Sequence, residues 1–214
     1  MSARENILGR IRNAQSRLRP ETSTETIGNH LARHPRGPFP PPPDDLAACF
    51  KQRAIKLSSD VLETNERTQI PALLARYLND RALPLRGVCW ASFTGLPWRD
   101  AGLEIQSRPA TNQDLVGVTG AFCAIAETGT LMLLSGAETP ATTSLLPETH
   151  VAIVDPRRIV ATMEDAWDLL RNEYHQPPRA VNFVSGPSRT ADIEQTVTLG
   201  AHGPYRVLLI LAPP

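Results

Sequence analysis

The chain has 214 residues, of which 41% are hydrophobic, and this is enough for one sizeable domain with its own core. Its 22 basic and 22 acidic side chains leave a formal net charge of zero. A chain without excess positive charge lacks the electrostatic signature of a nucleic-acid-binding protein, so we expect no nucleic-acid partner.

Residues 1–19 are expected to form an amphipathic helix. Ser2 and Glu5 have the spacing of a capping box, and apolar residues from Ile7 to Ala14 share one face. Such a helix can dock on its own domain or on a partner, while an Arg-rich start also resembles a transit peptide. Residues 20–43 are expected to be a Pro-rich, extended linker, because proline has no N–H to donate and cannot continue a helix or a ladder.

Residues 44–214 are expected to form one α/β domain with a mainly parallel sheet flanked by helices, because strand-like and helix-like segments alternate there. Helices are predicted from Asp44 or Asp45, over 65–79, and from a capping box at Thr162 and Asp165. Strands are predicted at 56–62, 87–91, 103–105, several places in 115–134, 151–154, 180–184 and 207–211.

The cysteines argue against a metal or disulfide framework. Cys49, Cys89 and Cys123 are far apart in apolar surroundings, and no pair has CxxC spacing. We therefore expect no metal and no cofactor held by this chain. No apolar run approaches the roughly 20 residues that cross a bilayer, and no signal peptide is recognisable. We expect a cytoplasmic protein without a membrane partner.

Common enzymatic fingerprints are missing, including Walker A, G-x-G-x-x-G, G-x-S-x-G and H-E-x-x-H. One candidate site is the segment Glu127, Thr128, Gly129 and Thr130, which interrupts two apolar runs. A partly desolvated glutamate suits acid–base or nucleophilic work, so Glu127 is our catalytic candidate. The same glutamate could instead lie in an exposed turn or cap backbone N–H groups near Gly129.

A second candidate site follows the apolar run 180–184. We expect a buried strand of the parallel sheet, a turn at Gly186 and Pro187, and then a helix start, which would offer backbone N–H groups to an anion. Ordinary helix capping could explain several of these polar residues, but it does not explain Arg189 or His202. The candidate substrate- or anion-binding residues here are Gly186, Ser188, Arg189, Thr190, Asp192, His202 and Gly203. His150, at the start of a strand, is a further candidate that a structural role explains equally well.

Four motifs occur in the order typical of the LUD domain family, which the chain resembles. They are residues 126–131 (AETGTL), 145–150 (LLPETH), 185–194 (SGPSRTADIE) and 200–204 (GAHGP), and the resemblance spans about residues 44–214. It implies a fold like that of glucosamine-6-phosphate deaminase, ribose-5-phosphate isomerase and the coenzyme A transferases.

The resemblance also implies a role in oxidising L-lactate to pyruvate beside iron–sulfur lactate-utilization subunits. Because this chain lacks cluster-binding cysteines, iron–sulfur clusters are expected only in those partners, and this chain would bind a small anionic ligand. Two alternatives remain open. The chain could be a stand-alone enzyme on sugar phosphates, folates or coenzyme A esters, with Glu127 as base or nucleophile, or a structural or regulatory subunit without catalysis.

Overall fold

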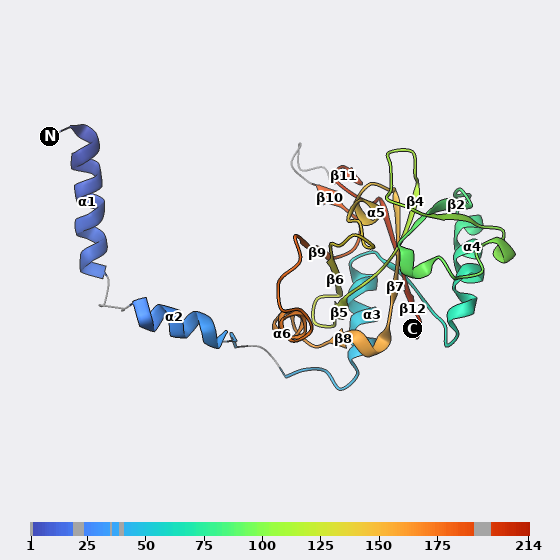
Figure 1. Ribbon diagram of the computed structural model, residues 1–214, viewed down its shortest axis with the longest axis horizontal. Coiled ribbons are helices and arrows are strands. Elements are labelled where there is room, and N and C mark those ends of the chain that lie inside the picture. The colour runs from blue at the N-terminus through green and yellow to red at the C-terminus, as the bar shows by residue number, and fades with distance from the viewer. Residues whose placement is uncertain (1, 19–23, 35, 39–40, 191–197) are drawn as a thin grey trace. The chain divides into compact units, whose positions relative to one another are not determined.

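The computed structural model describes residues 2–18, 24–34, 36–38, 41–190 and 198–214. Its internal contacts divide the chain into two units, Met1–Pro40 and Pro41–Pro214 (Figure 1). None of the helices in the described ranges is long and apolar enough to cross a membrane.

The N-terminal unit contains two helices, α1 (Ala3–Leu18) and α2 (Thr24–Arg33). The predicted capping box of α1 is confirmed: the backbone N–H of Ser2 donates to Glu5, and that of Glu5 donates to Ser2. Helix α2 falls within the segment 20–43, for which we predicted an extended linker, and the prediction is wrong for these ten residues. Prolines flank the segment but none lies inside it, so nothing prevents a helix there.

Six parallel strands form the main sheet of the larger unit, in the order β1-β12-β7-β4-β2-β3. Val151 of the central strand β7 lies between Val118 and Leu208, and all three side chains are fully buried. Such continuous apolar runs are typical of a parallel sheet covered on both faces. The strands are β1 (Asp60–Glu63), β2 (Arg86–Cys89), β3 (Glu104–Ser107), β4 (Val116–Gly120), β7 (Thr149–Val154) and β12 (Arg206–Leu211).

A second sheet has the order β8-β5-β6-β9 and is mixed, because only β5 and β8 run parallel. Its strands are β5 (Cys123–Ile125), β6 (Thr130–Leu134), β8 (Ile159–Val160) and β9 (Val181–Val184). The predicted α/β class with a mainly parallel sheet is therefore confirmed. The segment 180–184, however, is not a buried strand of the parallel sheet. It forms an edge strand antiparallel to β6, with Phe183 exposed, since β9 has a neighbour on one side only.

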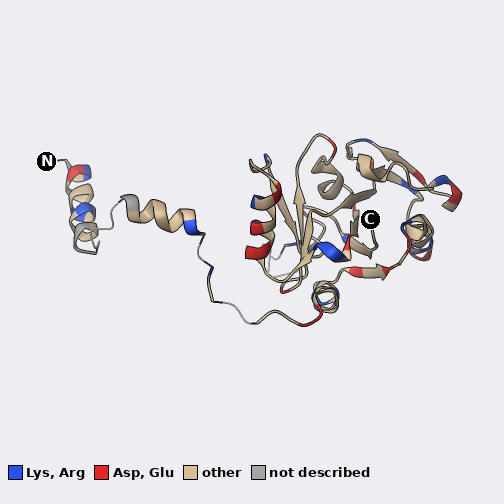
Figure 2. Ribbon diagram, turned by 60° about the horizontal axis from the view of Figure 1, so that its bottom comes forward, with Lys and Arg blue, Asp and Glu red and all other residues tan. Residues whose placement is uncertain are grey.

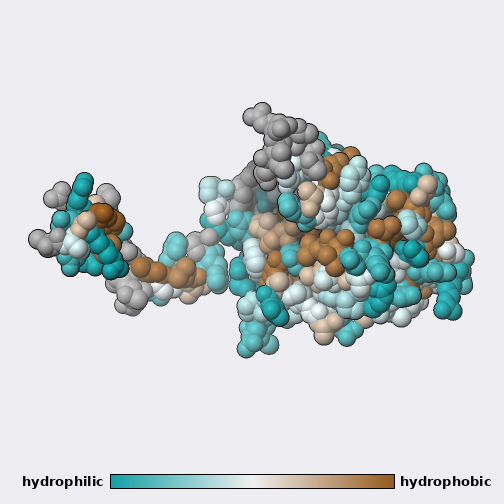
Figure 3. Space-filling model, turned by 90° about the horizontal axis from the view of Figure 1, so that it is seen from above, coloured by the Kyte–Doolittle hydropathy of each residue, from teal (hydrophilic) through white to brown (hydrophobic). Residues whose placement is uncertain are grey.

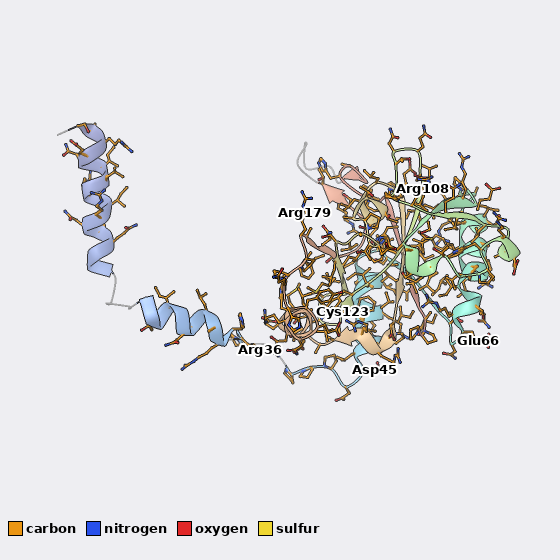
Figure 4. All side chains as sticks on the ribbon, in the orientation of Figure 1. Arg36, Asp45, Glu66, Arg108, Cys123 and Arg179 are labelled. Carbon is orange, nitrogen blue, oxygen red and sulfur yellow. The ribbon has the colours of Figure 1, made fainter. Side chains whose placement is uncertain are left out.

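Helix α3 (Leu46–Lys56) lies between the two sheets, in contact with β1 and β8 (Figure 1). Asp45, labelled in Figure 4, is its N-cap and accepts a hydrogen bond from the backbone N–H of Ala48 at 2.9 Å. Phe50 and Ala54 of this helix are fully buried in the larger core. Its position makes α3 the element against which the loops of the second sheet pack.

Helix α6 (Met163–Glu173) covers the other face of the second sheet. Side chains alternate between faces along a strand, so Leu131 of β6 joins the larger core whereas Met132 packs with Leu170 of α6. The predicted capping box of Thr162 and Asp165 is confirmed. The remaining helices are α4 (Ile70–Asp80), α5 (Thr142–Leu145) and the 3-10 turns η1 (Arg67–Gln69), η2 (Ala91–Phe93), η3 (Arg99–Ala101) and η4 (Pro156–Arg158).

Candidate functional site

The side chain of Glu127 lies at the start of helix α6. Its Oε1 accepts a hydrogen bond at 2.9 Å from the backbone N–H of Met163, the first residue of that helix. A carboxylate is favoured there because the first turn of a helix has free N–H groups and a partial positive charge. Glu127 is therefore half-buried and caps α6, rather than the groups around Gly129, while the neighbouring Thr128 is exposed.

Three other predicted site residues contact the C-terminal end of α3. Gly129 and Gly186 both have positive φ values, of 68° and 74°. A Cβ at Gly129 would lie 2.6 Å from the Ala54 nitrogen, and one at Gly186 would lie 2.4 Å from the Leu57 oxygen. Arg189 donates hydrogen bonds to the Leu57 carbonyl and the Ser58 hydroxyl. Glycine is required at both turns because the end of α3 passes so closely.

The two predicted segments do meet in the structure. The hydroxyls of Thr130, which is buried, and Ser185 form a hydrogen bond of 2.6 Å. This bond joins the end of the turn after β5 to the end of β9, beside the end of α3. The two segments selected by the resemblance therefore lie side by side. Each of the contacts just described is made to another part of the same chain and explains the residue's position without a ligand.

The predicted helix start after Gly186 is wrong for residues 189–190. Arg189 and Thr190 form the short strand β10 (Arg189–Thr190), which pairs antiparallel with β11 (Thr198–Leu199). The backbone of Ser188 extends this pairing: its N–H donates to Pro204 and its carbonyl accepts from Gly200, both at 2.9 Å. Ser188 and Thr190 therefore lie in an extended segment that pairs with residues 198–204, and they cap no helix among the described residues. Asp192 lies outside the described residues.

The Gly200–Pro204 motif lies at the amino end of the parallel sheet, directly before β12. His202 is exposed, and Gly203 lines a shallow cavity of about 370 Å³. Figure 3 shows hydrophobic areas beside hydrophilic ones on the face seen from above. The exposed large apolar side chains of the domain include Leu146, Leu199 and Tyr205, which line the same cavity.

His150 is completely buried between β4 and β12 and is closed to solvent. Its Nε2 forms a hydrogen bond of 2.8 Å with the hydroxyl of Thr119, and its Nδ1 has no partner among the described residues. Burial lowers the pKa of His150 from 6.5 to about 4, because charging the ring would cost its hydration. The ring is neutral at physiological pH, and its role in the structure is that of a core residue.

A different cavity, of about 440 Å³, lies at the carboxyl ends of the parallel strands. Strands β2 and β4 are neighbours whose connections leave in opposite directions, to β3 on one side and through the second sheet to β7 on the other. Ligands of open parallel sheets bind at such a reversal point. The cavity is lined by Arg67, Trp90, Ser92, Phe93, Gly120, Ala121, Phe122, Leu134, Ser135, Gly136, Thr139, Ile153, Asp155, Arg158, Tyr174, Pro178, Ala212, Pro213 and Pro214.

We did not predict this cavity from the sequence, although a signal for it exists. Trp90, Gly120 and Asp155 each follow or end an apolar strand, and the carboxyl ends of parallel strands share one edge of a sheet. Two of the charged lining residues are balanced within the chain. Arg158 makes a bidentate ion pair with Glu173, and hydrogen bonds from Arg157 lower the pKa of Asp155. Basic and acidic residues are interspersed over the whole domain (Figure 2).

The cysteines of the chain are separate thiols. Cys89 and Cys123 are buried, and burial raises their pKa values to about 11 and about 12, because the thiolate would lose its hydration. Cys123 is labelled on β5 in Figure 4. Within the described ranges, no group of three or more His, Cys, Asp or Glu side chains is arranged to hold a metal ion.

Comparison with known proteins finds one matching family model and several relatives. The model of the LUD domain matches residues 92–212. A protein of Exiguobacterium sp. named "Lactate utilization protein C" is 32% identical over 180 residues, which are 78% of either chain. The protein of that name from Bacillus subtilis is 29% identical over 188 residues, with the same coverage.

The fold also matches a solved structure, that of a DUF162 family protein from Deinococcus radiodurans. The TM-score is 0.58, and the match covers 78% of this chain and 96% of the other at 21% identity. At this identity the likeness supports the α/β fold and carries no information on activity.

Proposed function

The chain belongs to the LUD domain family, and we propose on that basis that it acts in lactate utilization. The observation that carries the proposal is the similarity to relatives named lactate utilization protein C, which extends over 78% of both chains. Similarity of that extent goes well beyond one shared motif.

We further propose that the chain works beside iron–sulfur partner subunits in the cytoplasm. Oxidation of lactate to pyruvate releases two electrons, which a redox centre must accept. The chain has three cysteines without CxxC spacing, and two of them are buried, so we place the clusters in partner subunits. The exposed apolar side chains of the N-terminal unit, Ile7 and Ile11 on α1 and Ile27 and Leu31 on α2, favour docking of this unit on a partner.

Affinity purification of the tagged chain from lactate-grown cells tests this proposal. We expect iron–sulfur proteins to be recovered with the full chain and to be lost when Ile7 and Ile11 are both replaced by Ser. A double replacement of the exposed Arg4 and Arg12 by Gln on the same helix is the control. Deletion of the gene should also prevent growth on L-lactate. Normal growth of the deletion strain, or purification without any iron–sulfur protein, would contradict the proposed role.

The alternative of a stand-alone enzyme depends on Glu127 as base or nucleophile. In the structure one oxygen of this carboxylate is occupied by the backbone N–H of Met163. Glu127→Gln keeps a hydrogen-bond acceptor at that position and removes the charge. A loss of lactate growth by this variant, with folding and partner recovery intact, would favour the enzymatic alternative. If growth persists, Glu127 is not a catalytic residue, and its hydrogen bond to the start of α6 has a structural role. The same substitution at an exposed position, Glu138→Gln, is the control.

A further inference from the structure

The carboxyl-edge cavity, defined by the residues described above, contains a positive charge that the chain itself does not balance. The guanidinium of Arg67 lies over the ring of Phe93, 5.3 Å from its centroid, and one nitrogen donates to the Ser92 carbonyl at 3.0 Å. The other N–H groups of Arg67 have no acceptor within the described part of the chain, and no described carboxylate lies within ion-pair distance. Since arginine stays charged at all relevant pH values, this half-buried cation is available to an anion.

The other charges of the cavity do not compete for this position. Arg158 is held by both oxygens of Glu173, at 3.0 and 2.9 Å. Asp155 is held by Arg157, whose guanidinium lies 2.9 Å from its carboxylate. Asp155 nevertheless remains an anion in the lining and repels a second negative charge. The charge pattern therefore fits a ligand with one negative charge better than a polyanion.

The lining of the cavity is mainly apolar and includes four aromatic side chains. Trp90 and Phe93 are buried, while Phe122 and Tyr174 form an edge-to-face pair with centroids 5.8 Å apart. Such a lining favours a ligand with an apolar body. A volume of about 440 Å³ is within the roughly 300–1,000 Å³ range of small-molecule sites.

We propose that the carboxyl-edge cavity binds a small monoanion with an apolar body, whose charged group is held by Arg67. Binding at this cavity can be measured on the purified chain, so this proposal is tested independently of the proposed role in lactate utilization. The site is distinct from the predicted segments at 127–130 and 185–203, because none of the described residues of those segments lines the cavity.

Fluorescence titration with 8-anilinonaphthalene-1-sulfonate tests the proposal, because this aromatic monoanion becomes fluorescent in an apolar site. We expect one molecule to bind per chain, and Arg67→Gln to weaken its binding about tenfold, the effect of losing one charge-assisted hydrogen bond. Arg76→Gln, on the exposed face of α4, is the control. The neutral analogue N-phenyl-1-naphthylamine should bind wild type and Arg67→Gln equally.

Ala121→Phe tests the location, because a larger ring after β4 occupies the cavity and should weaken binding of both probes. Near-UV circular dichroism of each variant must match the wild type, since the sulfonate probe also binds loosened cores. Equal affinity of the sulfonate for wild type and Arg67→Gln overturns the proposal, as does the absence of 1:1 binding. If Ala121→Phe does not fold, the comparison of charged and neutral probes on Arg67→Gln decides alone.

Discussion

The burial of His150 makes a specific prediction about stability and pH. In the folded chain its pKa is about 4, and in the unfolded chain the ring titrates near its ordinary value of 6.5. As the pH falls below 6.5, the unfolded chain takes up a proton that the folded chain refuses, so folding becomes less favourable. The loss ends below about pH 4, where both states are protonated.

The size of the effect follows from the two pKa values. The gap between 6.5 and about 4 corresponds to about 3 kcal/mol in the free energy of unfolding, and about 2 kcal/mol of this is lost by pH 5. Its cause is local: protonation would place a charge on a fully buried ring, and both ring nitrogens would then carry an N–H although Nδ1 has no acceptor among the described residues. The paired carboxylate of Asp114 also has a lowered pKa, but its contribution is lost only as the pH falls below about 4.

Urea unfolding between pH 8 and pH 5, followed by tryptophan fluorescence, measures this effect. We expect wild type to lose about 2 kcal/mol more than His150→Gln over that range, because glutamine does not titrate there but can still bond to Thr119. His175→Gln, at an exposed position, is the control and should keep the wild-type pH dependence. If wild type and His150→Gln lose stability in parallel, the burial of the neutral ring is not the cause and the reasoning is refuted.

Three further predictions concern the predicted motifs. Gly186→Ala should lower the melting temperature by several degrees, corresponding to about 1–3 kcal/mol, because φ is 74° and the new Cβ would meet the Leu57 carbonyl. Gly95→Ala is the control and should leave the melting temperature unchanged, because a Cβ at Gly95 would have no other atom within 4 Å. Thr162→Ala should cost about 1 kcal/mol in urea unfolding through loss of the α6 cap, and an unchanged midpoint would show that this cap contributes no stability. If residues 185–203 bind an anion, Arg189→Ala should abolish the rise in melting temperature on adding lactate, phosphate esters or coenzyme A. An unchanged rise would exclude Arg189 from the site.

The sequence identified the family better than it identified the site. Two of the four motifs lie side by side in the structure, because Thr130 of the first forms a hydrogen bond with Ser185 of the third. The residue roles we assigned to Glu127 and Arg189 remain predictions, and their contacts in the structure are with the ends of α6 and α3. The carboxyl-edge cavity was missed because residues from seven separate parts of the chain, from Arg67 to Pro214, assemble it.

Features that depend on neighbouring residues were determined by the sequence alone. The caps at Asp45 and Thr162 and the apolar strands at β4, β7 and β12 are examples, because a cap or a run of apolar side chains needs only a few adjacent positions. Only the tertiary structure decided that residues 189–190 pair with 198–199 instead of starting a helix. It also decided that β9 joins the second sheet, and that the end of α3 requires glycine at 129 and 186. Pairing and close approach are set by residues distant in the chain, and no local pattern specifies which of them will meet.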